Sequence, residues 1–166
     1  RTLTVANGQF GELAMRIANG IGGKAEAFSS PWGAPIDLDA FAEKLASGPY
    51  KLVTMVHNET STGATSRVAD IRKAIDRTKH PALFMVDTIS SLASIPYEHD
   101  AWGVDVTVAG SQKGLMLPPG LGFNAVSDKA LAASKKAQLP RSFWAWDEMI
   151  AANEKGYFPY TPATNL

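Results

Sequence analysis

Apolar residues recur along the chain with two different spacings, and the spacing separates expected helices from expected strands. Where apolar side chains return every three or four residues, they lie on one face of a helix. This pattern predicts helices over residues 10–21, 37–47, 66–78, 127–138 and 146–154. Shorter runs of apolar and β-branched residues, set between Gly, Pro and polar residues, predict strands. These runs are residues 3–5, 24–29, 51–56, 82–86, 104–108 and 122–126.

Strand-like and helix-like segments alternate through most of the chain, which is typical of βαβ units. The run at 82–86 (ALFMV) is continuously apolar instead of alternating with polar residues. Both faces of its sheet should therefore be covered, as they are in parallel sheets. The sequence predicts an α/β fold with three layers, in which the central sheet is mostly parallel.

Composition excludes several classes of function. The 166 residues include 16 Lys and Arg, 16 Asp and Glu, and no cysteine. A balanced charge provides no basic surface, so we expect neither nucleic acid nor a membrane as a partner. Without cysteine there is no disulfide, no thiolate metal site and no cysteine nucleophile. The three histidines lack the spacing of paired metal ligands, and we expect no metal.

Polar side chains follow three of the expected strands, at the point where each strand ends. Ligands in open parallel sheets bind outside the carboxyl ends of the strands, so these residues should meet at one edge. They are His57, Asn58, Glu59 and Thr60, then Asp87, and then Ser111, Gln112 and Lys113.

An acid and a lysine at such an edge suit one kind of chemistry. Desolvation lowers the pKa of a lysine and leaves some neutral amine to attack a carbonyl. A buried Asp87 needs a cation or a hydrogen-bond donor, and a protonated pyridine nitrogen is such a partner. Pyridoxal phosphate enzymes combine both parts. The residues alone leave ordinary alternatives open: a solvated lysine, an Asp that caps a helix or loop, a polar turn, and Phe10 in the core.

Two sequence motifs resemble the signature of the class V aminotransferases, which are pyridoxal phosphate enzymes of fold type I. They are Val86–Ala93 (VDTISSLA) and Ala109–Gly114 (AGSQKG). Four further segments in the same order support the resemblance, which runs from Asn7 to Leu166. These segments are His57–Gly63, Leu117–Gly120, Pro140–Phe143 and Tyr160–Leu166. Within the family, the motifs are most similar to the transaminases that act on serine and glyoxylate.

The resemblance implies a role for each matching residue. Lys113 would form the Schiff base with pyridoxal phosphate and then carry the proton between Cα of the substrate and C4′ of the cofactor. Asp87 would pair with the pyridinium nitrogen, and both residues would be catalytic. Phe10 would stack on one face of the cofactor ring.

Five more residues would contact the cofactor according to the same resemblance. Thr60 would lie near the phenolic oxygen, with Asn58 beside it. Ile89 would pack on the ring face opposite Phe10. Gln112 would reach the phosphate, and Thr161 would reach the phosphate of a neighbouring subunit.

The implied activity is transfer of the amino group of L-serine to glyoxylate, which gives hydroxypyruvate and glycine. Alanine–glyoxylate transamination is the alternative within the family, and a catalytically inactive α/β fragment is the alternative outside it. Cysteine desulfurase chemistry is disfavoured because it needs a thiol. The resemblance implies small amino acids and 2-oxo acids as substrates and a homodimer with shared active sites.

Residues 1–166 match only part of the large, cofactor-binding domain of such enzymes. The family's phosphate loop would lie before Arg1, and its small domain, with the arginine that binds the substrate carboxylate, would follow Leu166. The chain begins without methionine or a signal-peptide profile. We therefore expect a piece of a longer, cytoplasmic protein.

Overall fold

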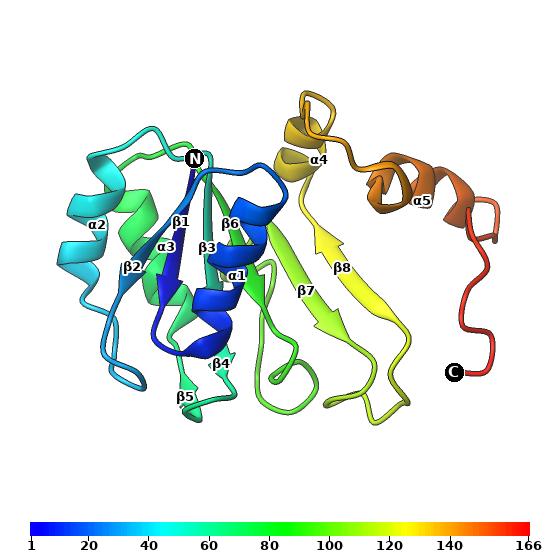
Figure 1. Cartoon of the computed structure of the whole chain (residues 1–166), viewed down its shortest axis with the longest axis horizontal. Coiled ribbons are helices and arrows are strands. Elements are labelled where there is room, and N and C mark those ends of the chain that lie inside the picture. The colour runs from blue at the N-terminus through cyan, green and yellow to red at the C-terminus, as the bar shows by residue number, and fades with distance from the viewer.

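The computed structural model describes residues 1–166 and contains one central sheet of six strands in the order β2-β1-β3-β6-β7-β8. The first five strands in this order are mutually parallel, and β8 runs antiparallel to β7 (Figure 1). The strands are β1 (Thr2–Ala6), β2 (Ala25–Ser29), β3 (Leu52–Val56), β6 (Leu83–Asp87), β7 (Val106–Gly110) and β8 (Gly122–Val126). A small hairpin, β4 (Asn58–Glu59) and β5 (Ala64–Thr65), follows β3. The predicted mostly parallel sheet is confirmed.

Five α-helices connect or follow the strands, close to their predicted positions. They are α1 (Gln9–Gly20), α2 (Leu38–Ala46), α3 (Val68–Arg77), α4 (Asp128–Ser134) and α5 (Trp146–Asn153), with a short 3₁₀ helix η1 (Ser142–Trp144). The predicted cap of α2 is also confirmed, since the Asp37 carboxylate accepts the N–H groups of Asp39 and Ala40. Helix α4 ends four residues before the predicted Gln138, because only its Ala130 is buried and little packing supports another turn.

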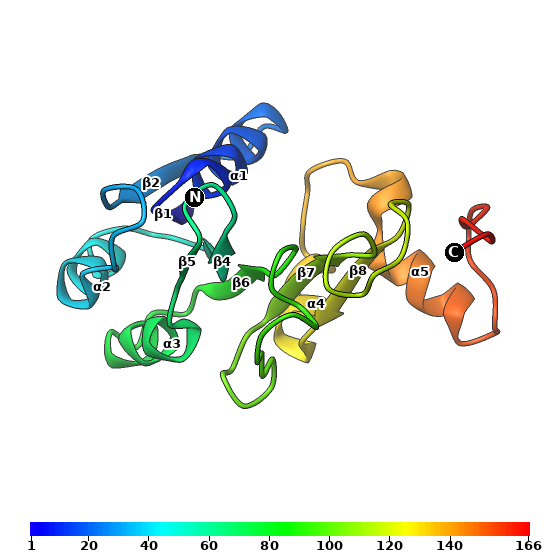
Figure 2. The ribbon, with the colours of Figure 1, turned by 90° about the horizontal axis from the view of Figure 1, so that it is seen from below.

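Helices cover both faces of the parallel part of the sheet, which gives the three predicted layers. Helix α1 packs on β1, β2 and β3, whereas α2 and α3 pack together on the opposite face (Figure 2). The main core lies under α2 and α3. Its fully buried members include Leu3, Phe84 and Val86 from the strands, with Phe41 and Ile75 from the helices. None of the helices is long and apolar enough to cross a membrane.

The apolar face of α1 does not form a core, although the sequence pattern alone suggested that it would. Only Gly11 of this helix is buried, while Ile17 and Ile21 are 56% and 68% exposed. A Cβ on Gly11 would lie 2.9 Å from the Ala6 Cα. The helix therefore approaches β1 through its smallest residue, while Leu13 and Ala14 of its apolar stripe are only half-buried.

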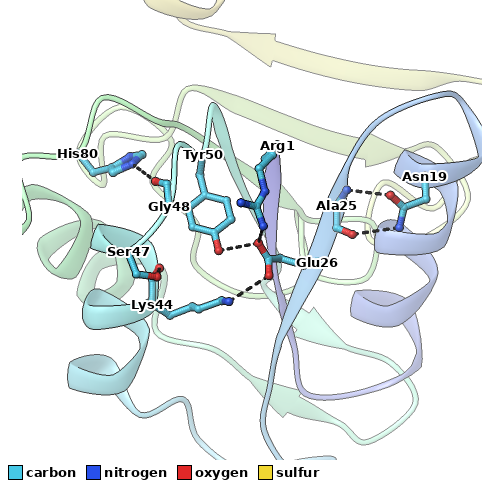
Figure 3. Close-up of polar contacts among 9 residues, drawn as sticks. All are labelled: Arg1, Asn19, Ala25, Glu26, Lys44, Ser47, Gly48, Tyr50 and His80. Atoms are coloured by element: carbon cyan, nitrogen blue, oxygen red, sulfur yellow. Dashed lines mark hydrogen bonds and ion pairs between the residues drawn. The ribbon is translucent and has the colours of Figure 1, made fainter.

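A polar network at the amino ends of the strands joins β1, β2 and α2. The Glu26 carboxylate on β2 accepts hydrogen bonds from Tyr50 (2.7 Å) and Lys44 (3.0 Å) and pairs with Arg1 (Figure 3). The Tyr50 hydroxyl and the Lys44 ammonium lower the pKa of Glu26. This network lies at the end of the sheet opposite the predicted site.

Candidate active site

The polar segments that follow β3, β6 and β7 lie at one edge of the sheet. Val56 is in register with Asp87, and Asp87 is in register with Val108 near the end of β7. Since the three strands are parallel, their carboxyl ends meet at the same edge (Figure 1). The structure therefore brings together the segments that carry Thr60, Asp87 and Lys113.

Few groups of the chain stabilise the negative charge of the Asp87 carboxylate. Successive residues of a strand point to opposite faces, so Asp87 faces away from the core that holds Val86, toward the layer of α1. Its Oδ1 accepts the N–H of Ile89 at 2.8 Å, and it forms no ion pair. Burial, and to a smaller extent the Glu59 charge, raise the pKa of Asp87. A cationic N–H brought to this carboxylate would remove the penalty, as a protonated pyridine nitrogen does.

Lys113 lies in the turn after β7, and its side chain is exposed. The turn is fixed on both sides. Ser111 is fully buried, and its hydroxyl donates to the Pro118 carbonyl at 2.6 Å. A Cβ on Gly114 would lie 2.2 Å from the Leu92 carbonyl oxygen. The turn that carries Lys113 therefore packs directly against the segment that follows Asp87.

Ile89 and Gln112 meet at Gly110, the last residue of β7. A Cβ on Gly110 would lie 3.3 Å from Ile89 Cδ1 and 2.8 Å from Gln112 Oε1. Thr60 joins the same region, because its hydroxyl is hydrogen-bonded to that of Ser90. Three predicted contact residues thus come from the loops after β3, β6 and β7 and lie at one end of the sheet.

Two predicted residues are placed differently. The Asn58 side chain donates to the Thr65 hydroxyl at 2.9 Å, so it is engaged within the small hairpin. Thr161 is exposed in the segment after α5, which Figure 1 shows beyond β8. Leu166, at the end of this segment, lies against the turn at Gly120. Thr161 forms no hydrogen bond with the other predicted residues.

His57 has a structural role. It is buried, its Nδ1 is 2.9 Å from the Ser91 hydroxyl, and its ring lies 5.3 Å from that of Tyr97 and 5.8 Å from that of Trp102. Burial lowers the pKa of His57, so its ring is neutral near pH 7. This cluster stabilises the segment after Asp87.

Sequence reasoning gave no role to Glu59, although its carboxylate is fully buried and contacts the first turn of α1. That turn carries Phe10, a residue that is 38% exposed at the same end of the sheet. The sequence held one weak indication of this contact. Gly8 precedes the helix and has no side chain that can cap it, which leaves the first N–H groups of the helix for another residue to bind.

The sequence model of the family described as "Aminotransferase class-V" matches residues 14–140. The chain belongs to the class V aminotransferases. Enzymes of this family use pyridoxal phosphate. The half-buried Asp87 without a cation and the Lys113 turn beside it fit this cofactor.

Similar proteins include several enzymes that act on glyoxylate. The chain is 46% identical to a serine–glyoxylate aminotransferase from Hyphomicrobium methylovorum, covering 96% of this chain and 40% of that protein. It is 42% identical to a serine–glyoxylate aminotransferase from Methylorubrum extorquens (100% and 43% covered) and 39% identical to an L-aspartate–glyoxylate aminotransferase from Paracoccus denitrificans (100% and 43%). The chain spans less than half the length of these relatives.

Two solved structures share the fold over the whole chain. An aspartate aminotransferase from Thermus thermophilus superposes with a TM-score of 0.87 at 33% identity, covering 100% of this chain and 46% of that one. An alanine–glyoxylate aminotransferase from Nostoc sp. superposes with a TM-score of 0.88 at 27% identity, covering 99% and 44%. These likenesses confirm the predicted α/β fold of a pyridoxal phosphate aminotransferase.

Proposed function

We propose that this protein is a transaminase that moves the amino group of L-serine to glyoxylate and yields hydroxypyruvate and glycine. The observation that carries the proposal is Asp87: a half-buried carboxylate without a cation, on the strand next to the one that ends at the Lys113 turn. The identity of 42–46% to two serine–glyoxylate aminotransferases supports the choice of substrates.

When bound, pyridoxal phosphate supplies an aldehyde that takes up the amino group and a ring that accepts electrons from the substrate. The residues of this chain bind it, orient it and move protons. The Asp87 carboxylate holds a proton on the ring nitrogen, the Phe10 ring fixes the plane of the cofactor, and Lys113 Nζ takes and returns the Cα proton of the substrate.

The remaining residues complete the binding site in this proposal. Ile89 packs on the ring face opposite Phe10, and Gln112 donates to the phosphate. Thr60 donates to the phenolic oxygen. Asn58 contributes in the same region once its side chain leaves the hydroxyl of Thr65, to which it donates in the structure.

A homodimer with shared active sites is part of the same proposal. Thr161 forms no hydrogen bond with the other predicted residues of its own chain, as expected for a residue that serves a second copy. The part of the chain from η1 onward also exposes large aromatic residues, with Trp144 78% and Tyr157 70% exposed, and such surfaces mark association sites. The assignment of residues 1–166 to part of a large domain and the cytoplasmic location remain predictions.

A different amino donor is the second candidate. The Paracoccus denitrificans relative is named for L-aspartate, and the Nostoc sp. structure is named for alanine. Both share glyoxylate as a substrate with the proposed reaction. The donor is therefore the open part of the proposal.

The test uses the full-length protein, pyridoxal phosphate and the Lys113→Ala variant. We expect the wild-type protein to develop the near-visible absorbance band of a cofactor bound through its aldehyde, and Lys113→Ala to lack it. Single-turnover reactions with L-serine, L-alanine and L-aspartate, followed at this band, then rank the donors, and L-serine should react fastest. A wild-type protein without the band is an inactive α/β protein, and the proposal fails.

A further inference from the structure

Glu59 is a fully buried carboxylate that the proposed chemistry does not use. It lies three residues after Val56, the last residue of β3, none of its surface is exposed, and it forms no ion pair. Burial of a charge without a cation is costly unless hydrogen-bond donors surround it. The neighbourhood of Glu59 must therefore supply those donors.

Four donors surround the carboxylate, two at each oxygen. Oε2 accepts the N–H groups of Phe10 (3.0 Å) and Gly11 (3.2 Å), both in the first turn of α1. Oε1 accepts the N–H (3.1 Å) and the hydroxyl (2.7 Å) of Ser61. The Ser61 hydroxyl oxygen in turn accepts the N–H of Gln9 at 3.0 Å. The first three N–H groups of α1 are thus all bound by the segment that follows β3.

This arrangement is an N-terminal cap supplied by a distant part of the chain. The residue that precedes the helix, Gly8, has no side chain to provide a cap. A Cβ on Gly8 would lie 2.2 Å from Glu59 Cγ and 2.8 Å from Ser61 Oγ, so only glycine leaves room for the carboxylate. A negative charge at a helix N-terminus is favoured by the helix dipole as well as by the N–H groups. The sequence around α1 is therefore built to receive Glu59.

We propose that Glu59 is a positioning residue of the cofactor site, which fixes the first turn of α1 against the loop after β3. The inference rests on the proposed function, in which Phe10 stacks on the cofactor ring and Thr60 contacts the phenolic oxygen. The N–H of Phe10 is bonded to Glu59, and Thr60 lies between Glu59 and Ser61 in the chain. One carboxylate thus sets the relative position of two cofactor contacts that lie far apart in the sequence.

Glutamine does not replace this carboxylate, although it has nearly the same shape. Each oxygen of Glu59 accepts two donors, and glutamine has only one side-chain oxygen. Its NH₂ group would face either the two N–H groups of α1 or the N–H of Ser61. Donors facing donors would separate the turn from the loop at one end of the side chain.

The experiment compares full-length wild-type protein with Glu59→Gln and with Ile75→Val as a matched control. Ile75 is fully buried in the core on the opposite face of the sheet. Without cofactor, amide exchange at Phe10 and Gly11 should be about ten- to hundredfold faster in Glu59→Gln, as expected when a hydrogen bond to a charged group is lost. With pyridoxal phosphate, Glu59→Gln should still form the absorbance band, but the circular dichroism of that band should fall to about half or less, since it reports the fixed orientation of the ring.

Kinetics add a second readout. We expect kcat of Glu59→Gln to fall about tenfold or more with a smaller change in KM, because the binding groups remain and only their orientation is lost. Ile75→Val should lower the melting temperature and leave the exchange at α1, the circular dichroism and kcat unchanged. Ser61→Ala removes one of the four donors and should have a smaller effect of the same kind, so it carries the test if Glu59→Gln does not fold.

The outcomes separate the two proposals. A wild-type protein that forms no cofactor band refutes the proposed function and this inference together. A wild-type band combined with unchanged exchange and unchanged circular dichroism in Glu59→Gln, or in Ser61→Ala if it replaces it, refutes this inference alone. The same changes in Ile75→Val would also refute it, because they would then follow from any loss of stability.

Discussion

Replacing Asp87 by asparagine separates the effect of its charge from the effect of its shape. The asparagine oxygen can still accept the Ile89 N–H that Oδ1 accepts at 2.8 Å. The variant loses the negative charge, which burial and Glu59 disfavour in the protein without cofactor. A neutral hydrogen bond of this kind contributes about 1 kcal/mol. We therefore expect the free energy of unfolding without cofactor to stay within about 1 kcal/mol of the wild-type value.

The substitution should instead lower the rate of the reaction. Two opposite charges about 4 Å apart attract by about 4 kcal/mol at an effective dielectric constant of about 20. Without this attraction, the protonated form of the ring nitrogen is less stable by the same free energy, and the ring accepts electrons from the substrate less readily. Because about 1.4 kcal/mol corresponds to a tenfold change in rate, kcat of Asp87→Asn should fall about a thousandfold.

The assay is a single-turnover reaction with L-serine in full-length protein saturated with pyridoxal phosphate, together with urea unfolding of the cofactor-free protein. Glu26→Gln is the control, because this carboxylate lies at the opposite end of the strands and should leave the rate unchanged. Turnover of Asp87→Asn within about tenfold of the wild-type rate would refute the assigned role of the charge.

The same variant has a defined dependence on pH. The pKa of Asp87 in the folded, cofactor-free protein lies above its ordinary value of 3.8. Stability from this group is therefore present at acid pH and is lost as the pH rises through the folded-state pKa. Urea unfolding should show that the stability of Asp87→Asn relative to the wild-type protein increases as the pH rises from about 4. A relative stability that decreases over this range would contradict the raised pKa.

Three further predictions concern stability and are checked by urea unfolding. Glu26→Gln should be less stable than the wild-type protein at neutral pH, because contacts with Tyr50 lower the pKa of Glu26 in the folded state. The difference in stability should shrink as the pH falls below 4.5, the ordinary pKa of this side chain. A difference that stays constant with pH would contradict this. Phe84→Ala should lose about 3–5 kcal/mol, because its ring is fully buried in the core; a loss under about 1 kcal/mol would show that the site collapses around the cavity. Gly8→Ala should lose about 1–3 kcal/mol, because its Cβ would lie 2.2 Å from Glu59 Cγ, and an unchanged midpoint would show that Glu59 moves freely.

Much of the fold could be predicted because local patterns encode it. The apolar run at 82–86 and the helical stripe at 66–78 gave β6 and α3 to within two residues. Strand β7 begins two residues later than predicted. The Asp105 carboxylate, just before β7, accepts the N–H of Phe84 at 2.9 Å. A contact between residues so far apart leaves no mark on the local pattern.

Part of the candidate site could be predicted for the same reason. Asp87 and the Lys113 turn follow strands that the sequence identifies, and parallel pairing then places them at one edge. The hydrogen bond of Asn58 to Thr65 and the exposure of Thr161 depend on how loops close. No spacing along the chain specifies those contacts.

The sequence by itself determined the alternation of strands and helices, the parallel sheet and the residues that follow each strand, because these depend on neighbours along the chain. The tertiary structure alone decided that Gly11 packs on β1 and that Ile17 and Ile21 of the apolar stripe stay exposed. It also decided that Glu59 caps a helix that begins fifty residues earlier. These features arise where distant segments meet, and there the space left by a missing Cβ and the need of a buried charge for donors determine the structure.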